Sequence, residues 1–331
     1  MKQKATFSTP LFILVIYALL IGAHILEKTL IDSGGNLYLT VIILEILIFI
    51  IPSIIFCRLK GMNYSTKLNI KLFSPDKFGI TILTSLTAIL GSIVIRLLQI
   101  NFGGMTEFGF SMFETYLSLE EDPVFLFTVM AFSVMPAIAE EFVFRTIVLT
   151  EYNEAGLGAV TASIISSLLS SMMFFDLGKL PIFFFAGIMF CALTYATGSS
   201  LCSVLCHILF SIYGIFGEKY VVSALLNPPN KIIGVFTFTL LFLVIAAITF
   251  GEYEHVLKKM GYSGAPSPSY KLKKSDDGTT PDISATEAEE EGLADSDTIS
   301  AKTGLSIEAF FSPTFLLCLL VFAIAIFGLF R

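Results

Sequence analysis

The sequence predicts an all-α protein, a polytopic transmembrane helix bundle of about eight spans with a ninth span after a disordered linker. Three observations predict this class. Of the 331 residues, 55% are hydrophobic and 14% are charged, whereas about one quarter of the residues of a soluble domain are charged. Apolar runs of about 20 residues, enough to cross a bilayer, recur along the chain. These runs lack the period-2 alternation of β-barrel strands, which favours helices.

The apolar runs define the elements in order. We predict spans at residues 11–30, 38–58, 78–100, 124–150, 158–176, 180–197, 199–217, 232–250 and 309–330. The first run is too long for a signal-peptide core, and no small-residue cleavage site follows it. A soluble protein with nine buried helices would need more polar surface than this composition supplies. We therefore interpret residues 1–250 as one transmembrane helical domain and residues 309–331 as a C-terminal transmembrane helix.

The net charge of −7 comes from one segment. Between Ser275 and Thr298 there are nine acidic residues and no basic one, and without them the chain has 18 acidic and 20 basic residues. Such a stretch cannot bury enough apolar surface to fold, so residues 251–308 are predicted to be a flexible acidic cytoplasmic linker. A solvated spacer is favoured over a regulatory or partner-binding tail. Nucleic-acid binding is not expected, because the sequence has no adequate basic patch.

Lysine and arginine in the short loops predict the orientation. Lys2 and Lys4 precede the first span, and further basic residues lie between spans two and three and after span eight. The loop at 101–122 carries acidic residues and no basic one. We therefore predict a multi-pass protein of the cell membrane with a cytoplasmic N-terminus.

Two local patterns leave alternatives open. Residues 105–121 have apolar side chains at helical spacing, which fits either an amphipathic helix at the membrane surface or a packed loop. Cys202, Cys206 and His207 could ligate a soft metal, but packing of small residues between helices is the favoured interpretation. An odd number of cysteines, five, without CxxC pairs predicts no disulfide framework and no structural zinc site.

The fourth span contains the strongest functional signal, the segment AIAEEFVFRTIVL. Ionisable groups within a membrane are costly, so each is a functional candidate. Glu141 and Arg145 are four residues apart and can form an ion pair on one helix face. Glu140 then points about 100° away at 3.6 residues per turn, which leaves it available for chemistry. The alternative is an ion pair that only fixes helix packing, and this alternative gives Glu140 no purpose.

Further polar residues lie in other spans. His207, in the segment SSLCSVLCHILFS, is the second candidate, and Ser211 follows it one turn later on the same face. A lone histidine in a membrane helix is more often a hydrogen-bonded core residue than a ligand. The charged residues of the fourth span favour a functional role for His207. His24, Glu27 and Glu45 are interpreted as groups that pack or line an aqueous cavity.

These motifs resemble the CPBP family of intramembrane proteases, which includes the CAAX prenyl endopeptidases and bacterial Abi-type proteins. That family carries EExxxR, FxxxH and HxxxN or HxxxD on three neighbouring spans. Here EEFVFR at 140–145 matches the first motif, and HILFS at 207–211 matches the third in its histidine but has Ser211 in place of Asn or Asp. The similarity covers roughly residues 120–217, which we interpret as a protease-like core.

The second motif departs from the family. In the register SLLSSMMFFDLGKLP, Phe174 stands where histidine is expected and Ser170 where phenylalanine is expected. With a turn near Gly156, Glu140 and Phe174 would lie at similar depth. A phenyl ring neither ligates a metal nor accepts a proton. Asp176 is the nearest replacement, and it can substitute only if the helix has already ended.

The resemblance implies a metalloendopeptidase site. Glu140 would be the general base, His207 and Ser211 would polarise the substrate carbonyl, and Glu141 and Arg145 would hold the geometry. Zinc, possible by resemblance, would be bound by Glu140 and His207, whereas catalytic zinc normally takes three protein ligands. The sequence therefore leaves zinc doubtful and predicts no other cofactor.

Three functions remain open. The first is an intramembrane endopeptidase that hydrolyses membrane-associated or prenylated peptides. The second is a catalytically impaired pseudoprotease that binds a membrane partner, for instance in bacteriocin maturation or immunity. The third is a small proton-coupled transporter that uses Glu45, His24 and Glu140, although the pseudo-symmetric halves typical of transporters are not evident. The expected partners are the lipid bilayer and a membrane-associated peptide or protein.

Overall fold

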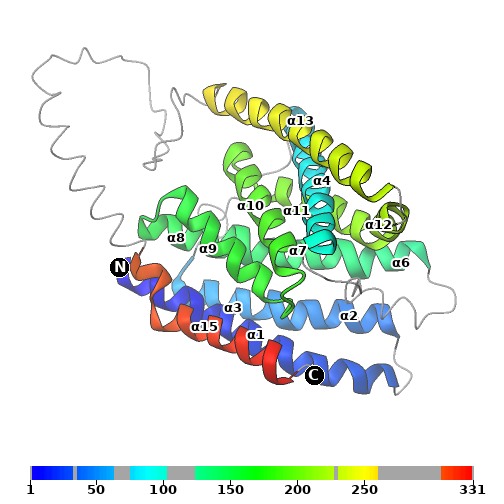
Figure 1. Cartoon of the computed structure of the whole chain (residues 1–331). Coiled ribbons are helices and arrows are strands. Elements are labelled where there is room, and N and C mark those ends of the chain that lie inside the picture. Colours follow the sequence, from blue (N-terminus) through cyan, green and yellow to red (C-terminus); the bar gives the residue numbers. More distant parts are fainter. Residues whose placement is uncertain are drawn as a thin grey trace, which may run out of the picture.

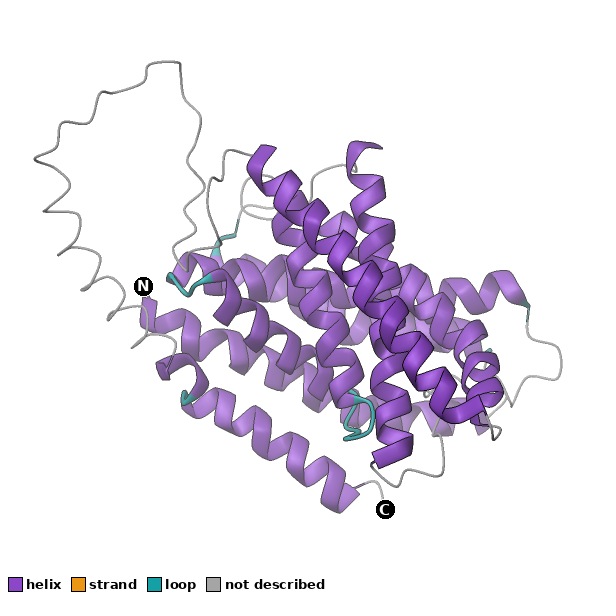
Figure 2. Ribbon diagram, turned by 45° about the horizontal axis from the view of Figure 1, so that its top comes forward, coloured by secondary structure: helices purple, strands orange, loops and turns teal. Residues whose placement is uncertain are grey.

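A computed structural model of the chain describes residues 2–32, 36–62, 75–102, 124–226, 230–259 and 307–329 (Figure 1). Every secondary-structure element in these ranges is a helix (Figure 2). The prediction of an all-α helix bundle is confirmed. The loop at 105–121 and most of the predicted linker lie outside the described ranges, as do the side chains of residues 24–32.

The helices follow the order of the apolar runs. Their bounds are α1 (Lys2–Asp32); α2 (Leu37–Glu45), η1 (Ile46–Ile50) and α3 (Ile51–Lys60); η2 (Pro75–Lys77) and α4 (Phe78–Phe102); α6 (Phe125–Val129), η3 (Met130–Val134), α7 (Met135–Glu141), η4 (Phe142–Val148) and α8 (Leu149–Ala155); α9 (Ala159–Met172); α10 (Leu180–Thr197); α11 (Ser200–Ile212), η5 (Tyr213–Gly217) and α12 (Glu218–Leu226); α13 (Asn230–Lys259); and α15 (Pro313–Ile324) with η6 (Ala325–Leu329).

Seven helical stretches of the described residues are long and apolar enough to cross a membrane. They are Ala5–Ala23, Leu37–Lys60, Phe78–Asn101, Phe125–Ala155, Leu180–Thr197, Ser200–Val221 and Ile232–Lys258. These correspond to seven of the predicted spans. The chain is therefore a multi-pass membrane protein in contact with the lipid bilayer.

The two other predicted spans are shorter than expected. The span at 158–176 contains only the 14 residues of α9, because the helix ends at Met172 and Phe175 adopts a positive φ of 48°. The span at 309–330 is interrupted at Ser312, whose side chain accepts a hydrogen bond from Phe315 N and begins α15. The helix α13 in turn continues to Lys259, past the predicted start of the linker at 251.

The stretch α6–α8 lies between two groups of helices (Figure 1). On one side, α1, α2–α3 and α15 pack against it together with α9, in one apolar cluster that includes Val143 and Phe144 of η4. On the other side, α4, α10 and α11 share a second cluster, and α13 packs on α4. The EExxxR segment of the sequence is therefore in the interior of the bundle.

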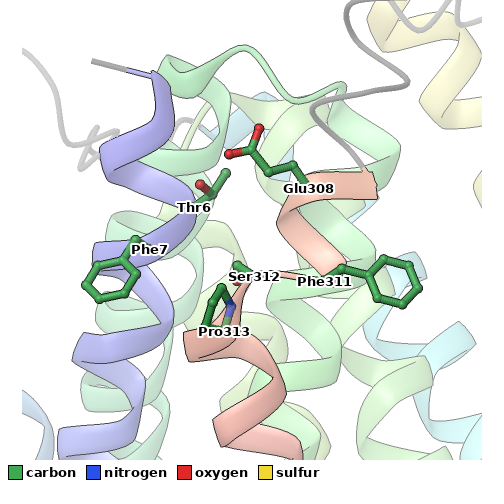
Figure 3. A pocket seen from close by; sticks show the side chains of 6 residues that line it. All are labelled: Thr6, Phe7, Glu308, Phe311, Ser312 and Pro313. Atoms are coloured by element: carbon green, nitrogen blue, oxygen red, sulfur yellow. The ribbon is translucent and has the colours of Figure 1, made fainter.

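The C-terminal helix packs along the first helix. The hydroxyl of Thr314 donates to the carbonyl of Phe7 at 3.0 Å, and Cys318 Sγ approaches the carbonyl of Pro10 at 3.4 Å. A pocket of about 490 Å³ opens where these two helices begin (Figure 3), and its lining residues are Thr6, Phe7, Glu308, Phe311, Ser312 and Pro313. None of the predicted site residues lines this pocket.

Polar contacts join helix ends that the sequence predicted to lie on the same side of the membrane. Lys60 Nζ lies 2.7 Å from Glu151 Oε2 at one end of the bundle. At the other end, Arg96 Nε lies 3.1 Å from Glu218 Oε1, and Gln99 donates to the carbonyl of Gly178 at 2.7 Å. The alternating direction of the spans agrees with this pairing.

Candidate active site

The helix that carries Glu140 and Glu141 is irregular where these residues lie. It changes from the α-helical α7 to the π-helical η4 at Phe142, and Arg145 lies within η4. A second π-helical segment, η3, precedes Pro136 at the start of α7. Proline lacks the N–H that a regular helix needs, and π-helical turns are frequent at functional sites. Because η1, η5 and η6 are π-helical as well, the buried acidic pair rather than the helix geometry marks this stretch as a candidate site.

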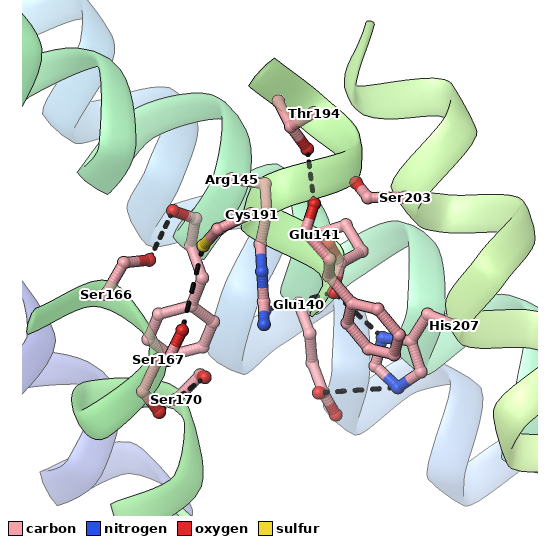
Figure 4. Close-up of polar contacts among 12 residues, drawn as sticks. Glu140, Glu141, Arg145, Ser166, Ser167, Ser170, Cys191, Thr194, Ser203 and His207 are labelled. Carbon is pink, nitrogen blue, oxygen red and sulfur yellow. Dashed lines mark hydrogen bonds and ion pairs between the residues drawn. The ribbon is translucent and has the colours of Figure 1, made fainter. Parts of the chain in front are cut away.

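Glu141 contacts both Arg145 and His207. Its Oε1 atom lies 3.0 Å from Nη1 of Arg145 and 3.0 Å from Nδ1 of His207 (Figure 4). The Glu141 and Arg145 side chains are buried. The ion pair expected from the i, i+4 spacing is present, and it is extended by a histidine that lies 66 residues later in the chain.

Glu140 faces the other nitrogen of the same imidazole. Its Oε2 atom lies 3.9 Å from Nε2 of His207, and both side chains are buried. This separation is longer than a direct hydrogen bond, and at such a length a bridging water has to be considered. Because Nδ1 contacts the Glu141 carboxylate, it carries the proton, and Nε2 is the atom that can meet a reacting group.

The Arg145 guanidinium depends on a glycine on α10. A Cβ added to Gly187 would lie 3.0 Å from Arg145 Nη2 and 2.9 Å from Ser167 Cβ. The guanidinium also lies over the ring of Phe190 at 5.3 Å, and that ring stacks on His207 with centroids 5.2 Å apart. Sequence reasoning missed Gly187 and Phe190, because their roles arise from contacts between helices.

Phe174, at the expected histidine position, lies in the turn beyond α9. Its ring stacks on Phe183 with centroids 3.8 Å apart. Phe183 meets Phe210 edge to face at 6.2 Å, and Phe210 meets Phe190, which stacks on His207. Aromatic packing therefore connects this position to the imidazole, and Phe174 supplies no polar group.

Asp176 does not replace the expected histidine. The helix has ended before it, as substitution would require, but its Oδ1 accepts a hydrogen bond from Gly178 N at 2.7 Å. Its Oδ2 lies 3.7 Å from Lys179 Nζ. These contacts shape the turn into α10.

Ser211 lies one turn after His207 on α11 and is partly buried. Within the described part of the chain, no hydrogen bond joins it to the acidic residues, Arg145 or His207. Cys202 and Cys206 are buried in the apolar cluster between α4, α10 and α11, in agreement with the packing interpretation.

One family model matches the chain. Residues 122–213 match the model for type II CAAX prenyl endopeptidase Rce1-like proteins. This segment is an Rce1-like domain. It contains Glu140, Glu141, Arg145, Phe174, His207 and Ser211. Neither the curated proteins nor the solved structures gave a significant match. The resemblance to the CPBP family agrees with this domain.

The Rce1-like domain does not offer the ligand set of catalytic zinc. Such a site takes three protein ligands, and in the parts of the chain that the structure describes no three histidine, cysteine or acidic side chains are grouped so as to hold a metal ion. Glu140 and His207 supply two ligands, and Phe174 contributes none. Histidine held by a carboxylate is common in metal sites, but the donor set present here does not fit the metal.

Glu45 was interpreted from the sequence as a packing or cavity residue. In the structure it is the last residue of α2, and α2 packs against α7 of the Rce1-like domain. The side chains of His24 and Glu27 are outside the described set.

Proposed function

We propose that this membrane protein is an intramembrane endopeptidase that hydrolyses membrane-associated or prenylated peptides. The observation that carries the proposal is the position of His207 between the two carboxylates, with Nδ1 at 3.0 Å from Glu141 and Nε2 at 3.9 Å from Glu140. The CAAX-protease-like character of the domain supports the substrate class.

In the proposed reaction, Glu140 is the general base. Its carboxylate accepts a proton from a water molecule, and the water oxygen attacks the carbonyl carbon of the scissile peptide bond. The proton then passes from Glu140 to the amine that leaves. A positioned general base typically contributes about 10²–10⁴-fold to the rate. No step requires a metal ion.

His207 stabilises the charge that develops on the carbonyl oxygen. When both ring nitrogens carry a proton, Nδ1 donates to Glu141 and Nε2 donates to the oxyanion. Glu141 and Arg145 hold the ring in position and balance its charge, and Phe190 supports one face of the ring. Removing one donor of this kind typically lowers kcat by about 10²–10³-fold.

A cleavage assay tests the proposal. Purified protein in detergent is incubated with a quenched fluorescent prenylated peptide, and the wild type is compared with Glu140→Gln. The matched control is Glu151→Gln, which lies on the same continuous helix and removes a carboxylate paired with Lys60. We expect cleavage by the wild type and by the control, and a loss of about 10²-fold or more in Glu140→Gln. Equal background cleavage by all three would reject the protease.

The stacking of Phe174 on Phe183 favours one alternative, a catalytically impaired pseudoprotease that binds a membrane partner. The variant Phe174→His separates the two functions. Cleavage that is absent in the wild type and appears in this variant would support the pseudoprotease. A proton-coupled transporter that uses Glu45, His24 and Glu140 stays a prediction from the sequence.

We further propose that the protein resides in the cell membrane with its N-terminus in the cytoplasm. The distribution of basic residues in the loops supports this orientation.

A further inference from the structure

The continuous helices α2–α3 and α6–α8 lie side by side and run in the same direction (Figure 1). Toward the N-terminal ends of the two helices, the rings of Tyr38 and Phe132 have centroids 6.2 Å apart. Near their C-terminal ends, Lys60 Nζ lies 2.7 Å from Glu151 Oε2. The partners differ by 94 and 91 positions, and Tyr38 also meets the ring of Phe127, 89 positions later, at 5.9 Å. Glu45 is therefore level with residues 134–139, within about two turns before Glu140.

Glu45 also lies on the face of its helix that packs against α7. One turn before it, Val41 belongs to an apolar cluster with Phe132. One turn after it, Phe49 belongs to the cluster that contains Val143. Residues at this spacing share a helix face. Oε2 of Glu45 is shielded from solvent, and the residue as a whole is partly buried.

The charges around Glu140 are unequally distributed. On its own helix, Arg145 pairs with Glu141, and His207 on α11 contacts Glu141 at 3.0 Å and Glu140 at 3.9 Å. The adjoining η1 and η3 carry no charged residue. Glu45 and Glu140 are thus two carboxyl groups at neighbouring levels of packed helices, where a charge on one strongly opposes a charge on the other. On α1, which also packs on α2, the side chains of His24, Glu27 and Lys28 lie beyond the described set.

We propose that Glu45 is a positioning residue of the site: it lies against Glu140 and, by charge repulsion, turns that carboxylate toward Nε2 of His207. The site therefore extends beyond the Rce1-like domain onto α2. The catalytic consequence rests on the proposed function, whereas the contact between Glu45 and Glu140 does not.

A double-mutant cycle on thermal unfolding in detergent tests the contact without reference to activity. Glu45→Gln keeps the shape of the side chain and removes its charge. We expect it to raise Tm by about 2 °C in the wild-type background, because relief of repulsion stabilises the folded chain and the Tm shift becomes smaller as the chain becomes longer. In the Glu140→Gln background the same substitution has no charge to relieve and should leave Tm unchanged. The matched control background is Glu151→Gln. In that background Glu45→Gln should raise Tm as it does in the wild type.

The kinetic measurement uses the peptide assay. If Glu45 positions Glu140, then Glu45→Gln lowers kcat about tenfold with KM unchanged, because only the transition state is affected. Glu45→Asp keeps the charge and should recover most of the activity. A merely structural residue would instead lower Tm and activity together.

The outcomes separate the two proposals. Equal Tm shifts for Glu45→Gln in the wild-type and Glu140→Gln backgrounds would overturn the contact, and so would a fall in Tm in both, which would assign Glu45 to a partner such as His24. Coupled Tm shifts in a protein that cleaves no peptide would retain the contact and reject the protease. Cleavage that is unaffected by Glu45→Gln would overturn the positioning role.

Discussion

The carboxylate of Glu141 contacts the imidazole of His207, with Oε1 3.0 Å from Nδ1. The same oxygen atom is 3.0 Å from Nη1 of Arg145. Three spans of the chain are relevant to this arrangement: α7 and η4 carry the acid and the arginine, α11 carries the histidine, and α10 packs between them through Phe190. Glu141 therefore organises the site, while Glu140 is the carboxylate left to act on a substrate.

Removal of the Arg145 charge should destabilise the protein strongly. Arg145→Met leaves the Glu141 carboxylate buried with His207 as its remaining partner. Loss of one partner of a buried ion pair costs about 3–5 kcal/mol. We expect a matching loss in the free energy of unfolding, measured by denaturation in detergent. The double variant Glu141→Gln/Arg145→Met should recover part of the loss, and equal stability of Arg145→Met and the wild type would contradict the burial of the pair.

A methyl group at Gly187 should disturb Arg145. Its Cβ would lie 3.0 Å from Arg145 Nη2 and 2.9 Å from Ser167 Cβ, so Gly187→Ala must move one of the two side chains. Overpacking of this kind typically costs about 1–3 kcal/mol. Gly214→Ala is the matched control, because a Cβ there meets no atom within 4 Å. Both variants are compared by thermal unfolding, and similar Tm values would argue against the close approach of α10 to Arg145.

Lys179, in the turn between α9 and α10, should make the stability of the protein depend on pH. Burial lowers the pKa of Lys179, against the opposing effect of Asp176, which lies 3.7 Å away. The unfolded chain therefore binds this proton more tightly than the folded chain. Consequently the free energy of unfolding should rise with pH between the lowered pKa and the ordinary value of about 10.4. The rise should be absent from Lys179→Met, and parallel pH profiles for the two proteins would contradict it.

The orientation can be measured with introduced cysteines. The five native cysteines are buried, so they should react slowly with a membrane-impermeant maleimide. Val124 and Lys258 are exposed at opposite ends of the bundle. In intact cells we expect labelling of Val124→Cys, and labelling of Lys258→Cys only after the membrane is opened. The reverse pattern would place the N-terminus outside.

Local patterns in the sequence were sufficient for part of this structure. Hydropathy identified the spans because burial in lipid imposes a minimum apolar length. The Glu141–Arg145 pair followed from helical spacing alone. Both features depend on neighbours within a few turns of the same helix, which the sequence displays directly.

Contacts between distant segments could not be predicted in the same way. The end of α9 is set by the positive φ of Phe175 and by the hydrogen bond from Gly178 to Asp176, so Phe174 lies in a turn where a longer helix was expected. The level of Glu45 relative to Glu140 depends on how two helices pack along their whole length. A hydropathy pattern carries no information on that offset.

In the proposed reaction, Glu140 and His207 hydrolyse a peptide bond with no third metal ligand. The most direct measurement is the rate of cleavage of a prenylated peptide by chelator-treated protein, with product masses determined for the wild type, Glu140→Gln and His207→Gln. We predict that the wild type retains its rate after chelation and that each variant loses about 10²-fold or more. Two results would contradict this mechanism. One is a loss of wild-type cleavage on chelation that adding zinc reverses, and the other is an equal rate for all three proteins.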